Sequence, residues 1–250
     1  MKWQLLNTGS NSGVFNMGFD IDLARNSKPG QAVLRLYRWR PYCISLGAHQ
    51  SIDSVNLNKA ADDNIEVVKR PTGGRAILHS EELTYSVIFP LSENLSAKDI
   101  YHDINLALIE GLKIYNSKLN EIEPESRQPD FPSFYKQEKS AICFAVPAKS
   151  ELKYFGKKLV GSAQRKLENT ILQHGSILCG LYHLNIVDYL YAENPQVLKS
   201  EIENTTTDLG SILNEKIDYD GLAKSVAKGF EIKFDMKFEK ALTPEFETIH

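Results

Sequence analysis

Short apolar runs separated by polar residues, glycine and proline fill the first ninety residues, and this pattern favours strands over helices. β-Branched and aromatic residues predict strands at 2–6, 32–39, 42–46, 65–69, 75–79 and 83–89. The last two are joined by a short polar link, which predicts a hairpin. Asn11 or Ser12 can cap a helix at 14–25, and a short helix is expected at 56–63.

The middle of the chain contains the clearest helical pattern. Ser96 can cap a helix at 98–119, where apolar residues recur at three-and-four spacing and predict a core-facing stripe. The polar, proline-containing segment 120–139 is expected to be a surface loop. Four strands then follow in the prediction and form a second sheet, at 141–145, 152–155, 159–165 and 170–178. The link at 166–169 makes the last two a hairpin.

Beyond residue 180 the pattern becomes helical again. Helices are expected at 186–191, 195–202 and 209–213, and from a cap at Asp218 or Asp220 to residue 228. Apolar residues then alternate with charged ones over 231–239, which predicts a final strand. No repeat or change in composition divides the chain. We therefore expect one α+β domain over 1–250, with mixed or antiparallel sheets and flanking helices, to which the segment from about 180 also belongs.

The composition limits the classes of function. The chain has 250 residues, of which 42% are hydrophobic and 24% charged, as in an ordinary globular protein. Its net charge of -3 argues against a nucleic-acid binder, which needs clustered Lys and Arg to neutralise phosphates. The N-terminus lacks the apolar core of a signal peptide, and no apolar run approaches the roughly 18 residues that suggest a membrane span. These features predict a cytoplasmic protein without nucleic-acid or membrane partners.

Cysteine and histidine spacing gives no sign of a metal site or a disulfide framework. The three cysteines, Cys43, Cys143 and Cys179, are odd in number and widely separated, without a C-x-x-C pair. The six histidines include no H-x-x-x-H pair. His79 and His174 lie beside glycine-containing turns and could face a pocket, although a hydrogen-bonded structural histidine is an equally valid interpretation.

The segment Arg70-Pro-Thr-Gly-Gly-Arg75 has two interpretations. Pro71 and the paired glycines are typical of a tight turn between two strands. The same backbone could also form a cradle, in which N–H groups between two guanidinium groups face an acyl carbonyl or a phosphate. A nucleotide-binding P-loop is disfavoured, because a strand-like run follows the glycines instead of Gly-Lys-Ser/Thr and a helix.

A lysine and a cysteine lie in apolar surroundings further along the chain. In Gly156-Lys-Lys158-Leu-Val-Gly161, both lysines could be solvated turn residues, but a strand buried on both faces would turn one of them inward, toward an anionic or carbonyl partner. Cys143 lies in an apolar strand-like run, where a cysteine is commonly a small buried hydrophobe. A nearby ammonium group would instead lower its pKa and favour the nucleophilic thiolate.

Several motifs resemble the lipoate-protein ligase and octanoyltransferase family, which is related to the biotin protein ligases. In chain order they are Arg70-Pro-Thr-Gly-Gly-Arg-Ala-Ile-Leu-His79, Glu82-Leu-Thr-Tyr-Ser-Val87, Lys158-Leu-Val-Gly-Ser-Ala-Gln164 and Leu172-Gln-His-Gly-Ser-Ile177. Ser140-Ala-Ile-Cys143-Phe, together with Gly-Ser-Ala-Gln, resembles the LipM type of octanoyltransferase, which has a cysteine nucleophile. The resemblance extends to about residue 178 and implies the fold of a biotin/lipoate ligase catalytic domain.

The resemblance also implies a reaction. Octanoyl would pass from acyl carrier protein to Cys143, with Lys158 as its catalytic partner, and then to a lysine of a lipoyl domain or of the glycine cleavage H protein, without a cofactor. The implied substrate-binding residues are Arg70, Thr72, Gly73, Gly74, Arg75, His79, Gly161, Ser162, Ala163, His174 and Gly175. Three alternatives stay open: an ATP-dependent lipoate ligase, an amidotransferase that moves octanoyl between lipoyl proteins, and a non-catalytic binder of carrier proteins.

Overall fold

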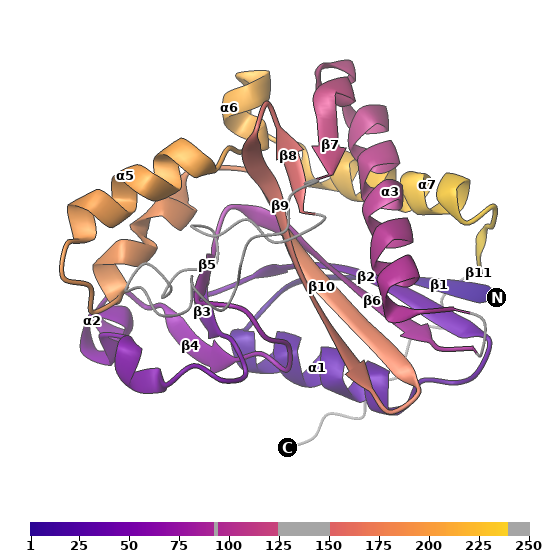
Figure 1. Ribbon diagram of the computed structural model, residues 1–250, viewed down its shortest axis with the longest axis horizontal. Helices are drawn as coiled ribbons and strands as arrows, with labels where there is room; N and C mark the ends of the chain where they lie inside the picture. The colour runs from indigo at the N-terminus through magenta and orange to yellow at the C-terminus, as the bar shows by residue number, and fades with distance from the viewer. Residues whose placement is uncertain (93–94, 125–150, 240–250) are drawn as a thin grey trace.

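Two β-sheets form the centre of the protein, seen here in a computed structural model that describes residues 1–92, 95–124 and 151–239 (Figure 1). The main sheet has eight strands in the order β11-β1-β2-β6-β10-β9-β8-β7, and the small sheet has three, in the order β4-β3-β5. The strands of the main sheet are β1 (Lys2–Asn11), β2 (Gln31–Trp39), β6 (Glu82–Pro90), β7 (Ile122–Pro124), β8 (Leu152–Tyr154), β9 (Lys157–Leu167), β10 (Thr170–Leu178) and β11 (Phe238–Glu239). Those of the small sheet are β3 (Cys43–Leu46), β4 (Glu66–Lys69) and β5 (Ile77–His79).

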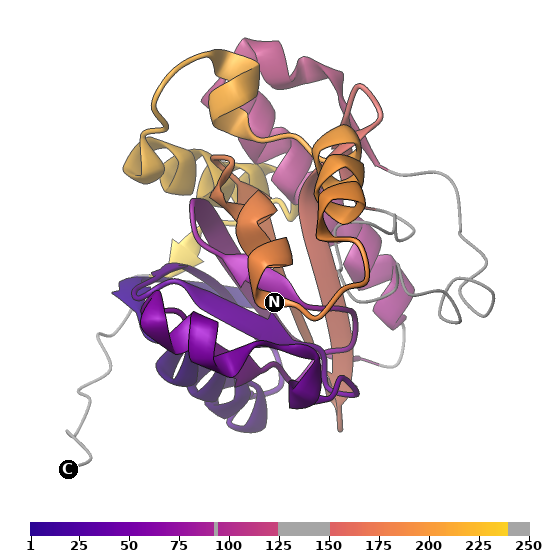
Figure 2. The ribbon, with the colours of Figure 1, turned by 90° about the vertical axis from the view of Figure 1, so that its left-hand side faces the viewer.

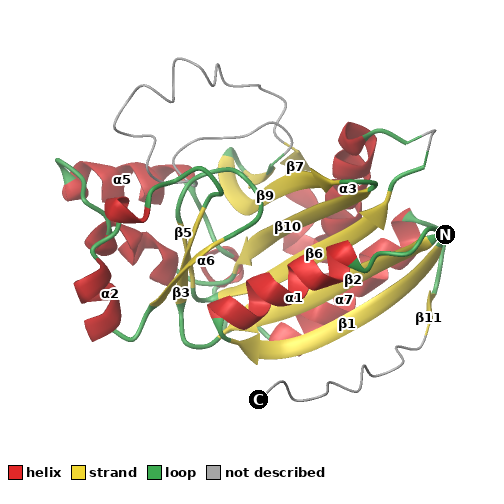
Figure 3. Cartoon of the chain, turned by 90° about the horizontal axis from the view of Figure 1, so that it is seen from below, coloured by secondary structure: helices red, strands yellow, loops and turns green. Residues whose placement is uncertain are grey.

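Helices cover both sheets. The α-helices are α1 (Gly13–Arg25), α2 (Leu57–Asp62), α3 (Ala97–Tyr115), α5 (Pro195–Thr205), α6 (Leu209–Leu213) and α7 (Tyr219–Lys233), and the 3-10 helices are η1 (Ile52–Ser54), η2 (Ser117–Glu121) and η5 (Tyr182–Tyr189). Figure 3 shows α1 in front of the main sheet and α7 behind it. Side chains of α2, α5 and η5 share a hydrophobic cluster with the small sheet, and these helices lie beside it in Figure 2. None of the helices in the described ranges is long and apolar enough to cross a membrane.

The helix starts follow the predicted capping chemistry. Ser12 accepts a hydrogen bond from the N–H of Phe15 at the start of α1, and Ser96 accepts one from the N–H of Asp99 in α3. The apolar stripe of α3 is buried against the main sheet, as predicted. Asp218 caps α7, which packs against α3.

Two glycines allow α3 and α7 to approach closely. A Cβ atom on Gly111 would lie 2.6 Å from the Cα of Val226, and one on Gly229 would lie 2.3 Å from the carbonyl oxygen of Ala107. Real Cβ atoms do not come this close to backbone atoms, so this helix crossing needs glycine on both helices.

The predicted hairpin of 75–79 and 83–89 is wrong. β5 pairs with β3 in the small sheet, whereas β6 pairs with β2 and β10 in the main sheet. Ile77 and Leu78 belong to the hydrophobic cluster of the small sheet, while Leu83 belongs to that of the main sheet. The two strands separate because each follows the core into which its side chains pack.

The second sheet is also different from the one predicted. The strands expected at 152–155, 159–165 and 170–178 are present as β8, β9 and β10, but they extend the main sheet, and the second sheet is formed by β3, β4 and β5. The hairpin between β9 and β10 is confirmed. Part of the expected loop at 120–139 is strand β7, which pairs with β8. The strand expected at 141–145 lies outside the described residues.

The strand predicted over 231–239 is helical in its first part. α7 continues to Lys233, because Phe230 and Phe234, one helical turn apart, both pack on Trp3, with ring centroids 5.8 and 4.7 Å from that of the indole. Ile232 points away from this contact and is 51% exposed. Asp235, with φ of 46°, follows the helix, and only Phe238–Glu239 forms a strand, parallel to β1. The alternation of apolar residues in this segment is therefore not a strand signal.

Candidate functional site

A pocket lies where the small sheet meets the face of the main sheet that α1 covers. It has about 370 Å³ of space unfilled by protein atoms, including a part open to solvent. Its lining residues are Met17, Tyr37, Trp39, Arg70, Ile77, His79, Thr84, Gly161, Ser162, Ala163, His174, Gly175 and Ser176. One helix and strands from both sheets therefore contribute to one cavity.

The pocket gathers most of the residues that the motifs indicated. Seven of the predicted site residues line it, namely Arg70, His79, Gly161, Ser162, Ala163, His174 and Gly175. In the described part of the chain, the lining does not include Thr72, Gly73, Gly74, Arg75 or Lys158. Cys143 lies outside the described residues, so its distance from the pocket stays a prediction.

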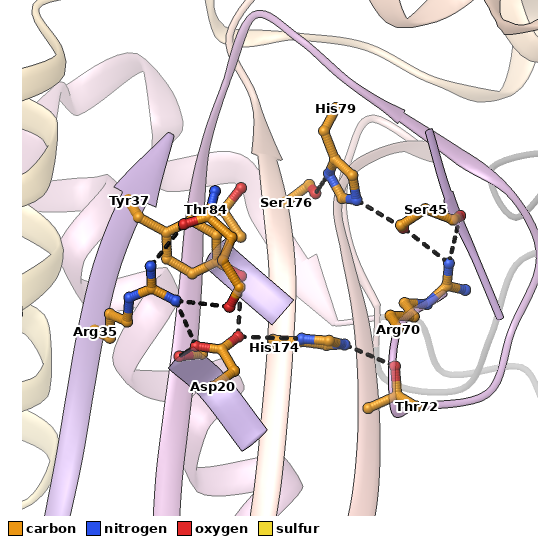
Figure 4. Close-up of polar contacts among 12 residues, drawn as sticks. Asp20, Arg35, Tyr37, Ser45, Arg70, Thr72, His79, Thr84, His174 and Ser176 are labelled. Carbon is orange, nitrogen blue, oxygen red and sulfur yellow. Dashed lines mark hydrogen bonds and ion pairs between the residues drawn. The ribbon is translucent and has the colours of Figure 1, made fainter. Parts of the chain in front are cut away.

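A hydroxyl, an imidazole and a carboxylate form a line from the glycine-containing turn to α1 (Figure 4). Thr72 Oγ1 lies 2.6 Å from Nε2 of His174, and Nδ1 of His174 lies 3.5 Å from Oδ2 of Asp20. All three side chains are buried. Burial, together with the charges of Arg70 and His79, lowers the pKa of His174 despite the nearby carboxylate, so the imidazole is neutral at pH 7.

Asp20 is held by three further partners. Its Oδ1 accepts hydrogen bonds from Arg35 Nη1 at 2.7 Å and from Ser86 at 2.8 Å, and its Oδ2 accepts one from the hydroxyl of Tyr37 at 3.0 Å. Burial alone would raise the pKa of Asp20, but the hydrogen bond from His174 and the charge of Arg35 hold it below its usual value. Asp20 is therefore a buried, fully ionised carboxylate at neutral pH.

A second line of the same kind crosses the other side of the pocket. Ser45 Oγ lies 2.7 Å from Nε2 of His79, whose Nδ1 lies 2.8 Å from Oε1 of Glu82. Arg70 extends this line, because its Nη1 donates to Ser45 Oγ at 3.1 Å and to the Ser45 carbonyl at 2.9 Å. Figure 4 shows Arg70 of this line beside Thr72 of the first.

Glu82 is buried under the pocket without lining it. Thr84 and Ser176 donate hydrogen bonds to its Oε1 at 2.5 and 2.7 Å. Burial would raise the pKa of Glu82, but the charge and the hydrogen bond of His79, with these hydroxyl groups, lower it. Above it, the indole of Trp39 stacks on the ring of His79 with centroids 4.0 Å apart, which fixes the imidazole plane.

The turn Arg70–Arg75 is a crossover and not a hairpin turn, because β4 and β5 lie on opposite sides of β3. Side chains and backbone from other elements hold its carbonyl groups. Arg70 Nη2 donates to the carbonyls of Gly73 and Arg75 at 2.9 and 2.7 Å. The N–H of Ala48 donates to the Thr72 carbonyl at 2.9 Å, and Arg165 Nη1 donates to the Pro71 carbonyl at 2.6 Å.

Gly74 and Gly47 are required by the shape of the turn, whereas a Cβ atom on Gly73 would meet nothing within 4 Å. Gly74 has φ of 95°, which side-chain-bearing residues rarely adopt. The carbonyl of Gly74 lies so close to Gly47 that a Cβ there would be 2.0 Å from it. Within the described part of the chain, the N–H groups of Gly73 and Gly74 have no hydrogen-bond acceptor. They are therefore free to donate to a substrate.

Lys158 points inward, as one of the two interpretations predicted, while Lys157 is exposed. Its ammonium group lies 2.6 Å from Oε1 of Glu151, and both side chains are at most 2% exposed. Nearby on the same face of β9, Ser162 Oγ lies 2.7 Å from the hydroxyl of Tyr85. Burial, aided by the charge of Glu151, raises the pKa of Tyr85 to about 12 although Ser162 and Gln173 bond to it.

Sequence reasoning missed four of the buried polar residues at this site: Asp20, Arg35, Ser45 and Glu82. The available signal was a charged residue inside an apolar run, such as Arg35 between Leu34 and Leu36 on a predicted strand. A charge in such a position needs a partner, but only the fold shows which one. Within the described ranges, no group of three or more His, Cys, Asp or Glu side chains could hold a metal ion.

The two described cysteines, Cys43 and Cys179, are buried and free. Burial, together with the charge of Glu82 near both, raises the pKa of each thiol. Neither is therefore activated as a nucleophile.

Comparison with known proteins gives consistent matches over nearly the whole chain. The model of the family described as Lipoyl protein ligase A/B catalytic domain matches residues 12–231. Octanoyltransferase LipM of Clostridioides difficile (strain 630) is 31% identical over 255 residues, which cover 98% of this chain and 92% of the relative. Octanoyltransferase LipM of Exiguobacterium sp. (strain ATCC BAA-1283 / AT1b) is 34% identical over 245 residues, which cover 95% of this chain and 88% of the relative.

Solved structures share the fold. Lipoate-protein ligase A bound with ATP superposes with a TM-score of 0.77 at 19% identity, over 96% of this chain and 89% of that one. The bipartite lipoate protein ligase of Thermoplasma acidophilum, solved in a study of that enzyme and its E2 lipoyl domain, superposes with a TM-score of 0.76 at 17% identity, over 96% and 87% of the two chains. At such identities the likeness concerns the fold alone, and it confirms the predicted fold class.

Proposed function

Since the chain belongs to the lipoyl protein ligase A/B catalytic-domain family, we propose that it is an octanoyltransferase of lipoate biosynthesis that works through a cysteine-bound acyl intermediate. The observation that carries this proposal is the match to LipM octanoyltransferases at about 30% identity over nearly the full length of both chains. The pocket beside the glycine-containing turn supports it, because a narrow cavity with few free polar groups suits a linear acyl chain.

The first half of the proposed reaction is a thioester exchange. The thiolate of Cys143 attacks the carbonyl carbon of octanoyl-acyl carrier protein, a C–S bond to Cys143 forms, and the C–S bond to the carrier breaks. The carrier leaves as a thiolate and takes up a proton. One thioester replaces another, so the free energy changes little and no nucleotide or other cofactor is required.

The second half is aminolysis. The neutral ε-amine of a lysine on a lipoyl domain or on the glycine cleavage H protein attacks the acyl-enzyme, an amide forms, and Cys143 leaves as a thiolate. The proton lost by the amine balances the one that the thiolate can regain. Because an amide is more stable than a thioester, this step drives the transfer to completion.

Each proposed role has support in the described residues. The buried ammonium of Lys158 would attract the Cys143 thiolate and the developing oxyanion, and Glu151 keeps it oriented. The N–H groups of Gly73 and Gly74 are free to donate to the same oxyanion. The pocket between Trp39 and Ala163 would hold the octanoyl chain, whose burial contributes about 0.8 kcal/mol per CH₂.

Acylation without ATP tests this proposal. The protein is incubated with octanoyl-acyl carrier protein, and the mass of each cysteine-containing peptide is measured. We expect an octanoyl adduct on Cys143, which Cys143→Ala abolishes. Cys43→Ala and Cys179→Ala are the matched controls and should retain the adduct, since both thiols are buried with raised pKa values.

Other outcomes identify the rival functions. Transfer that needs ATP and free lipoate and survives Cys143→Ala would indicate a lipoate ligase. Transfer from octanoylated H protein but not from the acyl carrier protein would indicate an amidotransferase. Complex formation with carrier proteins without any transfer would indicate a binding protein.

A further inference from the structure

Two buried carboxylates, Asp20 and Glu82, are connected to the glycine-containing turn although neither lines the pocket. Asp20 reaches the turn through His174 and Thr72, and Glu82 reaches it through His79, Ser45 and Arg70. The two connections start on different elements, α1 and β6, and end on neighbouring residues of the same turn. Both carboxylates can therefore act on the conformation of this turn.

The hydrogen-bond partners assign the protons of the first connection. His174 is neutral at pH 7, and its Nδ1 faces the ionised carboxylate of Asp20, so Nδ1 carries the proton. Nε2 is then an acceptor, and the hydroxyl of Thr72 donates to it at 2.6 Å. Thr72 is fully buried, so its side chain anchors the turn and does not contact substrate.

The second connection acts on the turn through a guanidinium group. Arg70 Nη1 donates to Ser45 Oγ, which lies 2.7 Å from Nε2 of His79, and Nδ1 of His79 lies 2.8 Å from Oε1 of Glu82. The remaining nitrogen atoms of Arg70, Nε and Nη2, donate to the carbonyls of Gly73 and Arg75. Glu82 thereby orients the side chain that holds two carbonyl groups of the turn.

The geometry of the peptide group links the held carbonyl groups to the direction of the free N–H groups. In a trans peptide the C=O and N–H bonds point in opposite directions. The Thr72 carbonyl accepts from Ala48, so the N–H of Gly73 points away from that strand end. The Gly73 carbonyl accepts from Arg70, so the N–H of Gly74 points away from the guanidinium group. The hydrogen bonds to the Thr72 and Gly73 carbonyl oxygens therefore fix the direction of the Gly73 and Gly74 N–H groups.

We propose that Asp20 and Glu82 are positioning residues that hold the glycine-containing turn, through His174–Thr72 and His79–Ser45–Arg70, in the conformation that presents the Gly73 and Gly74 amides to the reacting carbonyl. This inference rests on the proposed acyl transfer, in which those amides stabilise the oxyanion. It changes the role of Thr72 from a substrate contact to an anchor, and it gives a role to Asp20 and to Glu82, the first residue of the motif Glu82–Val87.

Thr72→Val and Thr72→Ser provide the central test, because valine keeps the shape of threonine and serine keeps its hydroxyl. The measurement is the single-turnover rate constant of Cys143 acylation by octanoyl-acyl carrier protein, at several donor concentrations. We expect Thr72→Val to lower the rate constant about 10- to 100-fold, as for loss of a group that orients a catalytic one, with little change in the half-saturating donor concentration. Thr72→Ser should restore most of the rate.

Thr206→Val is the matched control. Thr206 is also buried, and its hydroxyl lies 3.1 Å from Nε2 of His183 and donates to the Ile202 carbonyl. Its backbone forms a β-bridge with Lys158, which a change of side chain leaves in place. Thr206→Val should lose stability as Thr72→Val does and acylate at the wild-type rate per folded molecule. Equal slowing by both variants, or a wild-type rate for Thr72→Val, would overturn the inference.

Glu82→Gln tests the second connection independently and keeps the assay decisive if Thr72→Val does not fold. It removes the charge beside His79 and retains a carbonyl oxygen, and we expect about a 10-fold slower acylation. An unchanged rate would exclude Glu82 as a positioning residue. The proposed function is judged separately, because its failure would appear as the absence of a Cys143 adduct in the wild-type protein.

Discussion

The two faces of the main sheet are made by the same strands but have opposite chemistry. Along β6, Leu83 and Val87 pack into the apolar core beneath α3 and α7, while Thr84 and Ser86 donate hydrogen bonds to buried carboxylates on the other side. β10 alternates in the same way, with Ile177 in the core and Ser176 at the pocket. The first face is mainly apolar, with the hydroxyl groups of Tyr85 and Ser162 as polar exceptions, and the second carries a connected polar network around the pocket.

The difference separates stability from function. The apolar face stabilises the fold in proportion to the area it buries, about 25 cal/mol per Å². The polar face buries charges, and the free-energy cost of removing them from water offsets much of the gain from pairing them. A protein keeps such a network where it must place groups accurately, and here the network surrounds the pocket. Variants of each face should therefore fail in different ways.

Arg35→Met breaks the polar face and should give the largest effect. Arg35 is fully buried, and its Nη2 and Nη1 donate to Asn16 and Asp20. Its loss leaves the Asp20 carboxylate buried without its cation, which should lower the free energy of unfolding by about 3–5 kcal/mol. Urea unfolding followed by circular dichroism measures this change.

A second substitution shows whether Arg35→Met loses stability because the Asp20 charge is left unpaired or because the packing changes. Asp20→Asn in the Arg35→Met background removes the orphaned charge and should recover part of the lost stability, whereas neither change should restore acylation. If Arg35→Met lies within about 1 kcal/mol of wild type, the buried pair is not what holds this face together.

Phe230→Ala breaks the apolar face instead. The ring is fully buried and packs edge-on against Trp3, with centroids 5.8 Å apart. Truncation leaves a cavity and should cost about 3–5 kcal/mol, at most as much as Arg35→Met. Because Phe230 does not line the pocket, the acylation rate per folded molecule should stay at the wild-type value. A slowed rate at temperatures where the variant is folded would contradict the separation of the two faces.

Local sequence patterns predict where helices and strands lie better than they predict which strands pair or which side chains pack together. The caps Ser12, Ser96 and Asp218 were identifiable because a cap bonds to residues two or three positions away. The false hairpin of 75–79 and 83–89 shows the limit, because strand pairing depends on which distant core receives the side chains. For 231–239, the contacts of Phe234 with Trp3 decided between helix and strand, and these two residues are far apart in the chain.

The site shows the same limit. Motif residues such as His79 and His174 could be found, because each follows a recognisable segment and both line the pocket. The roles of Asp20 and Glu82 could not be found, although Glu82 opens one of the motifs, since nothing local distinguishes an acidic residue paired with a buried histidine from one exposed to solvent. Their roles depend on the register of β6 and β10, where Ser86 lies opposite His174.

Acid should weaken the fold through two histidines, one at the pocket and one in η5. Burial lowers the pKa of both His174, at the pocket, and His183, in η5. A histidine whose pKa is lower in the folded than in the unfolded state, where it is about 6.5, contributes stability that is fully present above pH 6.5. This stability is lost as the pH falls through the folded-state pKa. Asp20 and Glu82, whose pKa values are also lowered, add to the loss at still lower pH.

His174→Gln and His183→Gln should separate the loss of stability in acid, which both histidines cause, from an effect on acylation, which only His174 should have. The expected changes in unfolding free energy are smaller than those of the substitutions above. Each variant should flatten the fall in unfolding free energy between pH 7 and pH 5, measured by urea unfolding at each pH. Only His174→Gln should also alter the pH dependence of Cys143 acylation, because protonated His174 cannot accept the hydroxyl of Thr72. His183 bonds to Gly180 and Thr206, which do not line the pocket. If His183→Gln changes the acylation profile as much as His174→Gln, the coupling between protonation and the turn is not specific to the polar face.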